Sequence, residues 1–219
     1  MDRHFFAFGS GPPFTDNLAE KYIKLTKNGP VSIILAEREG WQAYMPNYTS
    51  KLKTYHPGGF SYIPLPTIQE KQAVKEIKAS GGIIICGGET ARYAEYIADT
   101  IIGDAIKEVY KQGVPVAGFS AGALISPEIC SISTNDNSEK FSVERKGIGL
   151  LENICFAVHF SEWNEESHLR ELAAKHPACV HYGIDEDTGL YFHNGRLETM
   201  EGEGVYQMEE GKCRKIHGG

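Results

Sequence analysis

Unbroken apolar runs are the feature of this sequence that most constrains its fold. Longer segments whose apolar residues recur every three or four positions separate these runs. A strand that is apolar on both faces is expected where helices cover both sides of a parallel sheet. The pattern therefore predicts an α/β fold with a mostly parallel sheet sandwiched by helices. The predicted strands are HFFAF (4–8), VSIILA (31–36), FSYIPL (60–65), GIIIC (82–86) and VPVAGF (114–119).

The segments between these runs have the periodicity of amphipathic helices. They cover residues 15–29, 68–82 and 90–114, and several end at glycine, as helix C-termini often do. We find no internal repeat, low-complexity tract or linker, and a chain of 219 residues suits one hydrophobic core. We therefore expect a single domain over residues 1–219.

The C-terminal part has a different pattern. Beyond residue 180, strand-like segments flank the pairs Asn194-Gly195 and Glu210-Gly211, which favour tight turns. We expect antiparallel hairpins there that extend one edge of the sheet. The polar stretch SISTNDNSEKFSVERK (131–146) is expected to be a surface loop near the functional site.

Composition and charge exclude several classes of partner. The formal net charge is −7 and the Lys and Arg residues are dispersed, which predicts no binding to nucleic acid or an anionic membrane surface. Five cysteines without close spacing predict reduced thiols, with neither disulfides nor a metal site. No window approaches the roughly 20 apolar residues of a membrane span, and the first apolar run is too short for a signal peptide. We expect a cytoplasmic protein.

One serine lies between small residues directly after an apolar run. The segment GFSAG (118–122) matches G-x-S-x-G, in which a serine occupies a strained strand-to-helix turn and the glycines leave room for close-packed backbone. A close contact between helix and strand would also explain the glycines, but it gives no reason for a serine at the centre. We therefore interpret Ser120 as a nucleophile.

A serine hydroxyl is a weak nucleophile near neutral pH and needs a base within hydrogen-bond reach. His159 ends the apolar run ICFAVHF, at the exit of a predicted strand, where α/β proteins assemble their sites. A hydrogen-bonded core histidine is the competing interpretation of this residue. The other histidines are expected to be incidental: His4 in the first strand, His56 in a connection, His168 and His176 on an exposed helix, His181 and His193 beside hairpin strands, and His217 in the tail.

Three consecutive carboxylates lie between two strand-like pieces in YGIDEDTGLYF. They are Asp185, Glu186 and Asp187, and such neighbours repel one another unless a partner or solvent relieves them. One of them could orient the histidine. A solvated acidic turn explains the same residues, and composition does not distinguish among the three.

A second glycine pair, Gly87-Gly88, ends the apolar run in IIICGGET (83–90) and leads into a predicted helix. A backbone amide at this turn could face a developing oxyanion, and the amide of Ala121 would supply a second donor. A simple turn between strand and helix accounts for the two glycines equally well.

The segments IIICGGETARY, VPVAGFSAGALI, FAVHFSE and GIDEDTGL, in this order, resemble the S51 serine peptidases, the family of dipeptidase E and cyanophycinase. The resemblance spans about residues 30–200. It implies a class I glutamine amidotransferase-like α/β sandwich and a serine peptidase of dipeptidase E type that hydrolyses short peptides through an acyl-enzyme. It also implies that the protein needs no cofactor.

The resemblance assigns roles to individual residues. Ser120 matches the nucleophile of the family, and His159 matches its general base. Glu186 matches the glutamate of the G-I-D-E segment, which completes a Ser-His-Glu catalytic triad. The backbone donors of the oxyanion hole fall on Gly88 and Ala121.

The sequence departs from the family pattern in two places. Cys86-Gly87-Gly88-Glu89 stands where relatives commonly carry three glycines followed by Asn or Asp. In the aspartyl dipeptidases an arginine on the helix after the catalytic histidine holds the aspartate of the substrate. Here that segment is acidic and Arg170 is its only arginine, so a preference for aspartate is not predicted.

Three alternatives to a dipeptidase stay open from the sequence. The first is a cyanophycinase-like peptidase, although the chain offers little beyond the core domain for gripping a polymer. The second is an esterase of α/β-hydrolase type, with Asp185 as acid and His193 or His217 as base. The third is a catalytically silent binding module. The sequence predicts no oligomeric state.

Overall fold

The computed structural model describes residues 1–55, 57–139 and 141–218, so His56 lies outside the described residues. Its largest sheet has seven strands in the order β11-β10-β1-β5-β4-β2-β3. The five N-terminal strands run parallel to one another, and β10 and β11 are antiparallel additions beside β1. The strands are β1 (His4–Phe8), β2 (Val31–Ala36), β3 (Phe60–Leu65), β4 (Gly82–Ile85), β5 (Val116–Phe119), β10 (Gly189–His193) and β11 (Arg196–Glu201). The predicted, mostly parallel sheet is confirmed.

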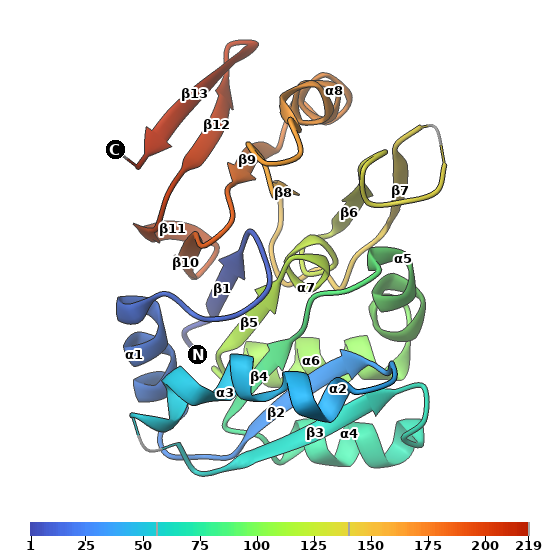
Figure 1. Cartoon of the computed structure of the whole chain (residues 1–219), viewed down its shortest axis with the longest axis vertical. Helices are drawn as coiled ribbons and strands as arrows, with labels where there is room; N and C mark the ends of the chain where they lie inside the picture. The colour runs from blue at the N-terminus through green and yellow to red at the C-terminus, as the bar shows by residue number, and fades with distance from the viewer. Residues whose placement is uncertain (56, 140, 219) are drawn as a thin grey trace.

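Helices cover both faces of this sheet, as predicted (Figure 1). In that view α1 (Asp16–Leu25), α2 (Trp41–Tyr44) and α3 (Pro46–Lys53) lie in front of the sheet, and α4 (Glu70–Lys78) and α6 (Ile101–Lys111) lie behind it. Each long helix turns an apolar stripe to the strands. On α1 the stripe consists of Leu18, Ala19, Tyr22 and Ile23, all buried.

The expectation of one helix over residues 90–114 is wrong. The segment folds as α5 (Thr90–Tyr93), a π-helical turn η1 (Ala94–Ala98) and α6. Thr100 separates the last two because its backbone is extended and its hydroxyl accepts a hydrogen bond from the amide of Ile102 at 3.1 Å. Such an N-cap starts a new helix, although the apolar periodicity continues across it.

A second sheet, which the sequence did not predict, forms the upper part of the molecule in Figure 1. Its order is β13-β12-β9-β8. The strands β8 (Ile154–Val158) and β9 (Val180–Ile184) are parallel, with α8 (Glu166–Lys175) between them in the chain. The strands β12 (Val205–Glu209) and β13 (Lys212–His217) form a hairpin beside β9.

The prediction that both C-terminal hairpins extend one edge of the main sheet therefore applies only to β10 and β11. Both predicted turns are present, with φ of 51° and 80° at Asn194-Gly195 and 49° and 75° at Glu210-Gly211. Between the hairpins the chain leaves the main sheet at Gly202, where φ is 119°. This positive φ suits glycine and redirects the chain, so that β12 pairs with β9.

The predicted surface loop 131–146 also contains regular structure. Its two ends belong to β6 (Ile129–Ile132) and β7 (Val143–Lys146), which pair in antiparallel fashion. The sequence did not indicate this hairpin because β7 reads Val-Glu-Arg-Lys and is half-buried to exposed. Polar strands of this kind lack the apolar alternation on which strand prediction depends.

One large hydrophobic cluster contains buried residues from both sheets. Phe156 of β8 and Tyr182 of β9 pack against Phe192 of β10, with ring centroids 5.8 and 5.9 Å apart. The single domain over 1–219 stays a prediction, but this aromatic contact couples the two sheets. Across the described ranges, no helix has the length and apolar character needed to cross a bilayer.

Candidate active site

Ser120 follows the last residue of β5 and precedes α7 (Ala121–Leu124). Its φ of 47° and ψ of −108° are strained for a residue with a side chain. The flanking glycines are required by close packing: a Cβ on Gly118 would lie 2.5 Å from the carbonyl oxygen of Gly122. A Cβ on Gly122 would lie 2.3 Å from the carbonyl oxygen of Ile85. The G-x-S-x-G segment thus forms the sharp strand-to-helix turn that its glycines predict.

The structure brings the three residues expected to form the triad into one hydrogen-bonded row. The Oγ atom of Ser120 is 3.0 Å from Nε2 of His159. The Nδ1 atom of the same imidazole is 2.7 Å from Oε1 of Glu186. Because a carboxylate only accepts hydrogen bonds, Nδ1 donates to Glu186, which leaves Nε2 as the acceptor that faces the serine hydroxyl.

The imidazole is largely enclosed, whereas the carboxylate reaches solvent. The His159 side chain is 12% exposed and that of Glu186 is 44% exposed. The indole ring of Trp163 stacks on the imidazole with centroids 4.1 Å apart and an interplanar angle of 12°. The Trp163 amide also donates to the His159 carbonyl at 2.8 Å. Sequence reasoning missed Trp163, because nothing in its spacing from His159 predicts this contact.

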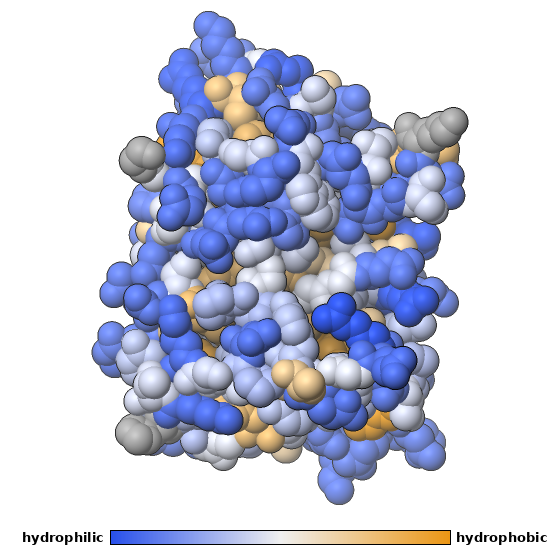
Figure 2. Space-filling view, in the orientation of Figure 1, coloured by the Kyte–Doolittle hydropathy of each residue, from blue (hydrophilic) through white to orange (hydrophobic). Residues whose placement is uncertain are grey.

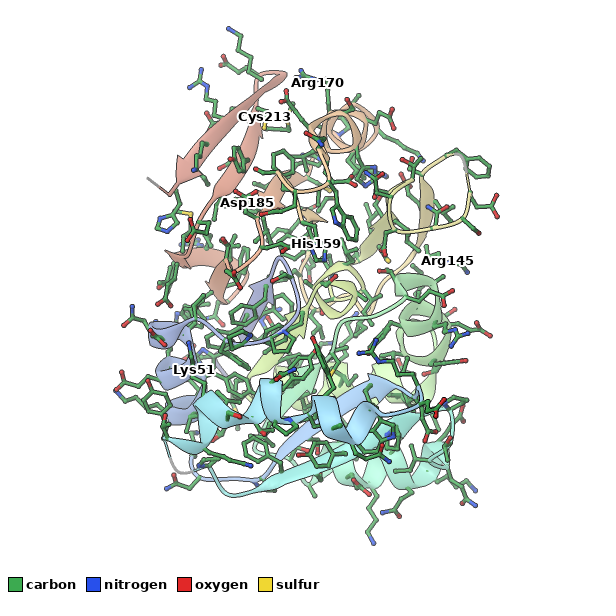
Figure 3. All side chains as sticks on the ribbon, viewed as in Figure 1. Lys51, Arg145, His159, Arg170, Asp185 and Cys213 are labelled. Atoms are coloured by element: carbon green, nitrogen blue, oxygen red, sulfur yellow. The ribbon has the colours of Figure 1, made fainter. Side chains whose placement is uncertain are left out.

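Asp185, the rival acid, points away from the imidazole. Its Oδ1 accepts a hydrogen bond from the amide of Ser161 at 2.9 Å. A Cβ on Gly204 would lie 2.2 Å from its Oδ2, so the carboxylate also lies against the turn before β12. In Figure 3, His159 and Asp185 lie between the two sheets. The structure therefore brings Glu186, and not Asp185, to His159.

The other histidines lie elsewhere among the described residues. His193 lies far from Ser120. It is the strand partner of His4 at the start of the five-residue strand β1, whereas the Ser120 amide donates a hydrogen bond to the Phe8 carbonyl at the end of that strand. His217 lies on β13, opposite Val205. His168, expected on an exposed helix, is half-buried: its Nε2 lies 3.3 Å from the hydroxyl of Ser131, and burial lowers its pKa. His176 pairs with Glu144, and His181 is buried.

The Gly87-Gly88 turn lies directly beside the serine. A Cβ on Gly87 would be 3.4 Å from the Cβ of Ser120. Two tyrosines fix the turn: the Gly87 amide donates to the Tyr48 hydroxyl, and the Tyr93 hydroxyl donates to the Gly87 carbonyl, each at 3.0 Å. On the other side Ala121 is the first residue of α7, so its amide has no acceptor within the helix.

The structure places the residues at both departures from the family pattern. Cys86 is buried, and burial raises the pKa of its thiol to about 12, so it is not a thiolate nucleophile at neutral pH. Arg170 pairs with Glu166 at 2.6 Å and donates to the Gly211 carbonyl at 2.5 Å. Figure 3 shows it at the top of the molecule, beside Cys213 and away from His159.

The 131–146 segment, expected near the functional site, brings Asp136 close enough to His159 for the two to interact electrostatically, and sequence reasoning did not single out this residue. The hydroxyl of Thr90 donates to Asp136. Burial raises the pKa of Asp136 to about 6, although Thr90 and His159 oppose the shift. A cavity of about 360 Å³ adjoins this carboxyl and is lined in part by Glu89, Glu139 and Arg145.

In Figure 2 most of the surface is hydrophilic, and pale or apolar residues show across the band between the upper and lower parts of the molecule and in smaller patches near its upper and lower ends. Within residues 1–55, 57–139 and 141–218, no cluster of three or more His, Cys, Asp or Glu side chains could hold a metal ion.

In this site a serine on a strained turn is hydrogen-bonded to an imidazole, and the imidazole is hydrogen-bonded to a carboxylate. This is the geometry of the serine hydrolases. The protein is therefore an α/β protein in which this geometry forms where the chain leaves the C-terminal ends of β5 and β8. The sequence model of Peptidase family S51 matches residues 36–200, and the chain belongs to this family.

Similar proteins agree with the family. Cyanophycinase from Geminocystis herdmanii (strain PCC 6308) is 26% identical over 149 residues, covering 66% of this chain and 55% of that protein. Cyanophycinase from Nostoc sp. (strain PCC 7120 / SAG 25.82 / UTEX 2576) is 27% identical over 137 residues, covering 60% and 46%. The chain thus matches about half the length of these curated relatives.

Two solved structures share the fold. A peptidase from an acI-B1 Actinobacterium superposes with a TM-score of 0.73 at 20% identity, covering 100% of this chain and 96% of that one. A putative Peptidase E protein from Listeria monocytogenes EGD-e superposes with a TM-score of 0.68 at 14% identity, covering 92% and 98%. These superpositions support the fold.

Proposed function

We propose that this protein is a serine peptidase that hydrolyses short peptides through an acyl-enzyme on Ser120. The observation that carries the proposal is the continuous row of two hydrogen bonds, 3.0 Å from Ser120 to His159 and 2.7 Å from His159 to Glu186. A solvated histidine or a structural serine would need neither contact. Membership of Peptidase family S51 supports the same reaction class.

In the proposed mechanism Ser120 Oγ attacks the scissile carbonyl carbon while His159 Nε2 accepts the hydroxyl proton. Glu186 orients the imidazole and stabilises the positive charge that it gains. His159 then returns the proton to the leaving amine as the C–N bond breaks, and the acyl-enzyme remains. A water molecule, deprotonated by His159, then attacks the ester carbonyl carbon. The bond from that carbon to Ser120 Oγ breaks, His159 returns the proton to Oγ, and the acid product leaves.

The oxyanion that forms in each addition step needs hydrogen-bond donors. We assign this role to the backbone amides of Gly88 and Ala121. The contact between Gly87 and Ser120 supports the first assignment, because it brings the turn before Gly88 beside the nucleophile. The position of Ala121 at the start of α7 supports the second, because the first amides of a helix have no acceptor within that helix.

The proposed substrate class is the short, unblocked peptide, as in dipeptidase E. The likeness in fold to a putative Peptidase E protein supports this choice. Arg170 is already paired with Glu166, which argues against a substrate aspartate at that arginine. The cytoplasmic location follows only from the sequence pattern and stays a prediction.

Cyanophycin is the second candidate substrate, because the matched curated relatives are cyanophycinases. The matched segment covers about half of each of those proteins, which leaves the parts that could hold a polymer unmatched. Release of soluble product from cyanophycin by the purified protein, at a rate above that for free dipeptides, would favour this candidate.

The test is digestion of a dipeptide library by the wild-type protein and by Ser120→Ala, followed by mass spectrometry. We expect the wild type to consume a subset of the dipeptides and the variant to lose about 10⁴-fold or more of the rate. Thr49→Ser serves as a control, because Thr49 is a buried hydroxyl residue of α3 whose hydroxyl donates to the carbonyl of Met45, the residue before that helix, at 3.3 Å. Undiminished turnover by folded Ser120→Ala would refute the proposal.

A further inference from the structure

The residues just after β1 contact the backbone of both the nucleophile and the base. The carbonyl oxygen of Phe8, the last residue of β1, accepts a hydrogen bond from the backbone amide of Ser120, with an N···O distance of 3.0 Å. The next carbonyl oxygen, that of Gly9, accepts a hydrogen bond from the backbone amide of His159, with an N···O distance of 2.9 Å. Two consecutive peptide groups therefore hold two residues that are far apart in sequence but form one hydrogen bond.

The same segment also holds the turn that carries the carboxylate. The amide of Gly9 donates to the carbonyl of Thr188 at 3.1 Å. The hydroxyl of Ser10 accepts the amide of Asp187 at 3.2 Å. These two contacts lie on the C-terminal side of Glu186. Residues 8–10 are therefore hydrogen-bonded to each of the three segments that carry Ser120, His159 and Glu186.

Both residues held by the carbonyls have strained backbone. The φ angle is 47° at Ser120 and 49° at His159, and conformations of this kind cost of the order of 1–3 kcal/mol each for residues with side chains. They persist only where the surroundings hold them. The Phe8 and Gly9 carbonyls are such a restraint, because each fixes the amide of one strained residue.

Gly9 also touches the loop that leads to the carboxylate. A Cβ at this position would lie 2.2 Å from the carbonyl oxygen of Asp185 and 2.5 Å from that of Ile184. Both contacts are with backbone, which cannot rotate aside. Any larger residue must push the Asp185-Glu186 backbone away from β1.

We infer that Gly9 is a positioning residue that sets the distance between Glu186 and His159. It does so because its carbonyl holds the backbone of the base while its missing side chain lets the carboxylate loop approach. This inference rests on the proposed function, since it concerns the geometry of the proposed triad. Gly9 lies outside residues 36–200, which the family model matches.

The first test is Gly9→Ala, with Gly11→Ala as the matched control in the same loop. A Cβ on Gly11 would meet only the Tyr44 hydroxyl, at 3.3 Å, the end of a side chain that can move. A displacement of about 1 Å in a catalytic group can cost about 10²-fold in rate. We expect kcat of Gly9→Ala to fall about 10²-fold with little change in KM, and kcat of Gly11→Ala to stay within about 2-fold of wild type.

A double-mutant cycle separates positioning from a general loss of structure. If Gly9 acts through Glu186, then Gly9→Ala should cost less than about 3-fold in a protein that already carries Glu186→Gln. Full loss in both backgrounds would overturn the inference. If Ser120→Ala and Glu186→Gln lose activity while Gly9→Ala keeps wild-type kcat, the inference fails and the proposed function stands.

A milder variant covers the case in which Gly9→Ala does not fold. Ser10→Ala removes the acceptor of the Asp187 amide, and Ser10→Thr keeps it. We expect kcat to fall about 5-fold in the alanine variant, because the loss of one hydrogen bond loosens only one side of the turn, and to return in the threonine variant. Wild-type kcat in Ser10→Ala would overturn the inference.

Discussion

Replacing Glu186 by glutamine tests the electrostatic part of the proposed mechanism. The substitution keeps the size of the side chain and removes its negative charge. His159 then loses the partner that stabilises its protonated form during acyl transfer. The matched control is Asp187→Asn, which removes an exposed carboxylate one residue away at a position with φ of 51°, where asparagine is well tolerated.

The magnitude follows from the distance and the exposure. At the 2.7 Å between Nδ1 and Oε1, Coulomb's law gives about 1.5 kcal/mol in a medium as polar as water and about 6 kcal/mol at an effective dielectric constant of about 20. These limits correspond to about 10-fold and about 10⁴-fold in rate. Because the Glu186 side chain is 44% exposed, we expect a loss of about 10²-fold to 10³-fold in kcat.

The assay is steady-state kinetics on the dipeptide that the wild type cleaves fastest, with thermal unfolding as a check on folding. We expect the loss to lie in kcat, because the charge on His159 forms only in the transition state. Asp187→Asn should stay within about 2-fold of wild type. A folded Glu186→Gln protein with more than about a third of the wild-type kcat would refute the reasoning.

Three further predictions concern residues around the row. Burial raises the pKa of Asp136 to about 6. The ionised carboxyl therefore destabilises the fold above pH 6, and this destabilisation disappears as the pH falls towards 4. Thermal melts of Asp136→Asn should show a higher melting temperature than wild type at pH 8 and no difference at pH 4. Trp163→Leu removes the ring stacked on His159 and should lower kcat about 2-fold to 30-fold in steady-state kinetics, whereas Trp163→Phe should recover most of the loss. Gly122→Ala places a Cβ 2.3 Å from the Ile85 carbonyl oxygen and should lower the free energy of unfolding by about 1–3 kcal/mol in urea titrations.

The parallel core of the fold could be predicted because its strands are apolar on both faces. The runs VSIILA and GIIIC have no polar alternation, and only a buried strand can use such a segment. The second sheet could not be predicted in the same way. Its assembly depends on β12 leaving β11 at Gly202, and the local pattern there reads equally as another hairpin strand on the first sheet.

The residues of the site differ in how far sequence reasoning reaches them. Ser120 and His159 each follow an apolar strand, and strand ends are where α/β proteins assemble their sites. The structure places the two strands, β5 and β8, in different sheets, which the sequence did not predict. Composition does not distinguish Asp185 from Glu186, and the resemblance to the family is what singled out Glu186 from the sequence. The structure shows that Asp185 turns to the Ser161 amide.

Gly9 and Trp163 mark the limit of the sequence signals. Gly9 follows an apolar strand just as Gly87 does, and the same reasoning could have singled it out. Its role depends on three distant loops, which no local pattern reveals. Trp163 lies four residues after His159, and only the positive φ of His159 and the turn that follows stack the two rings.

The central claim is that the row from Glu186 through His159 makes Ser120 nucleophilic. Reaction of the purified protein with a fluorophosphonate, followed by intact-mass measurement and peptide mapping, tests it most directly. The account predicts one adduct per chain, located on Ser120, and formed at least about 10²-fold more slowly in His159→Ala. Folded wild-type protein that stays unlabelled, or that is labelled at the same rate when His159 is absent, would contradict it.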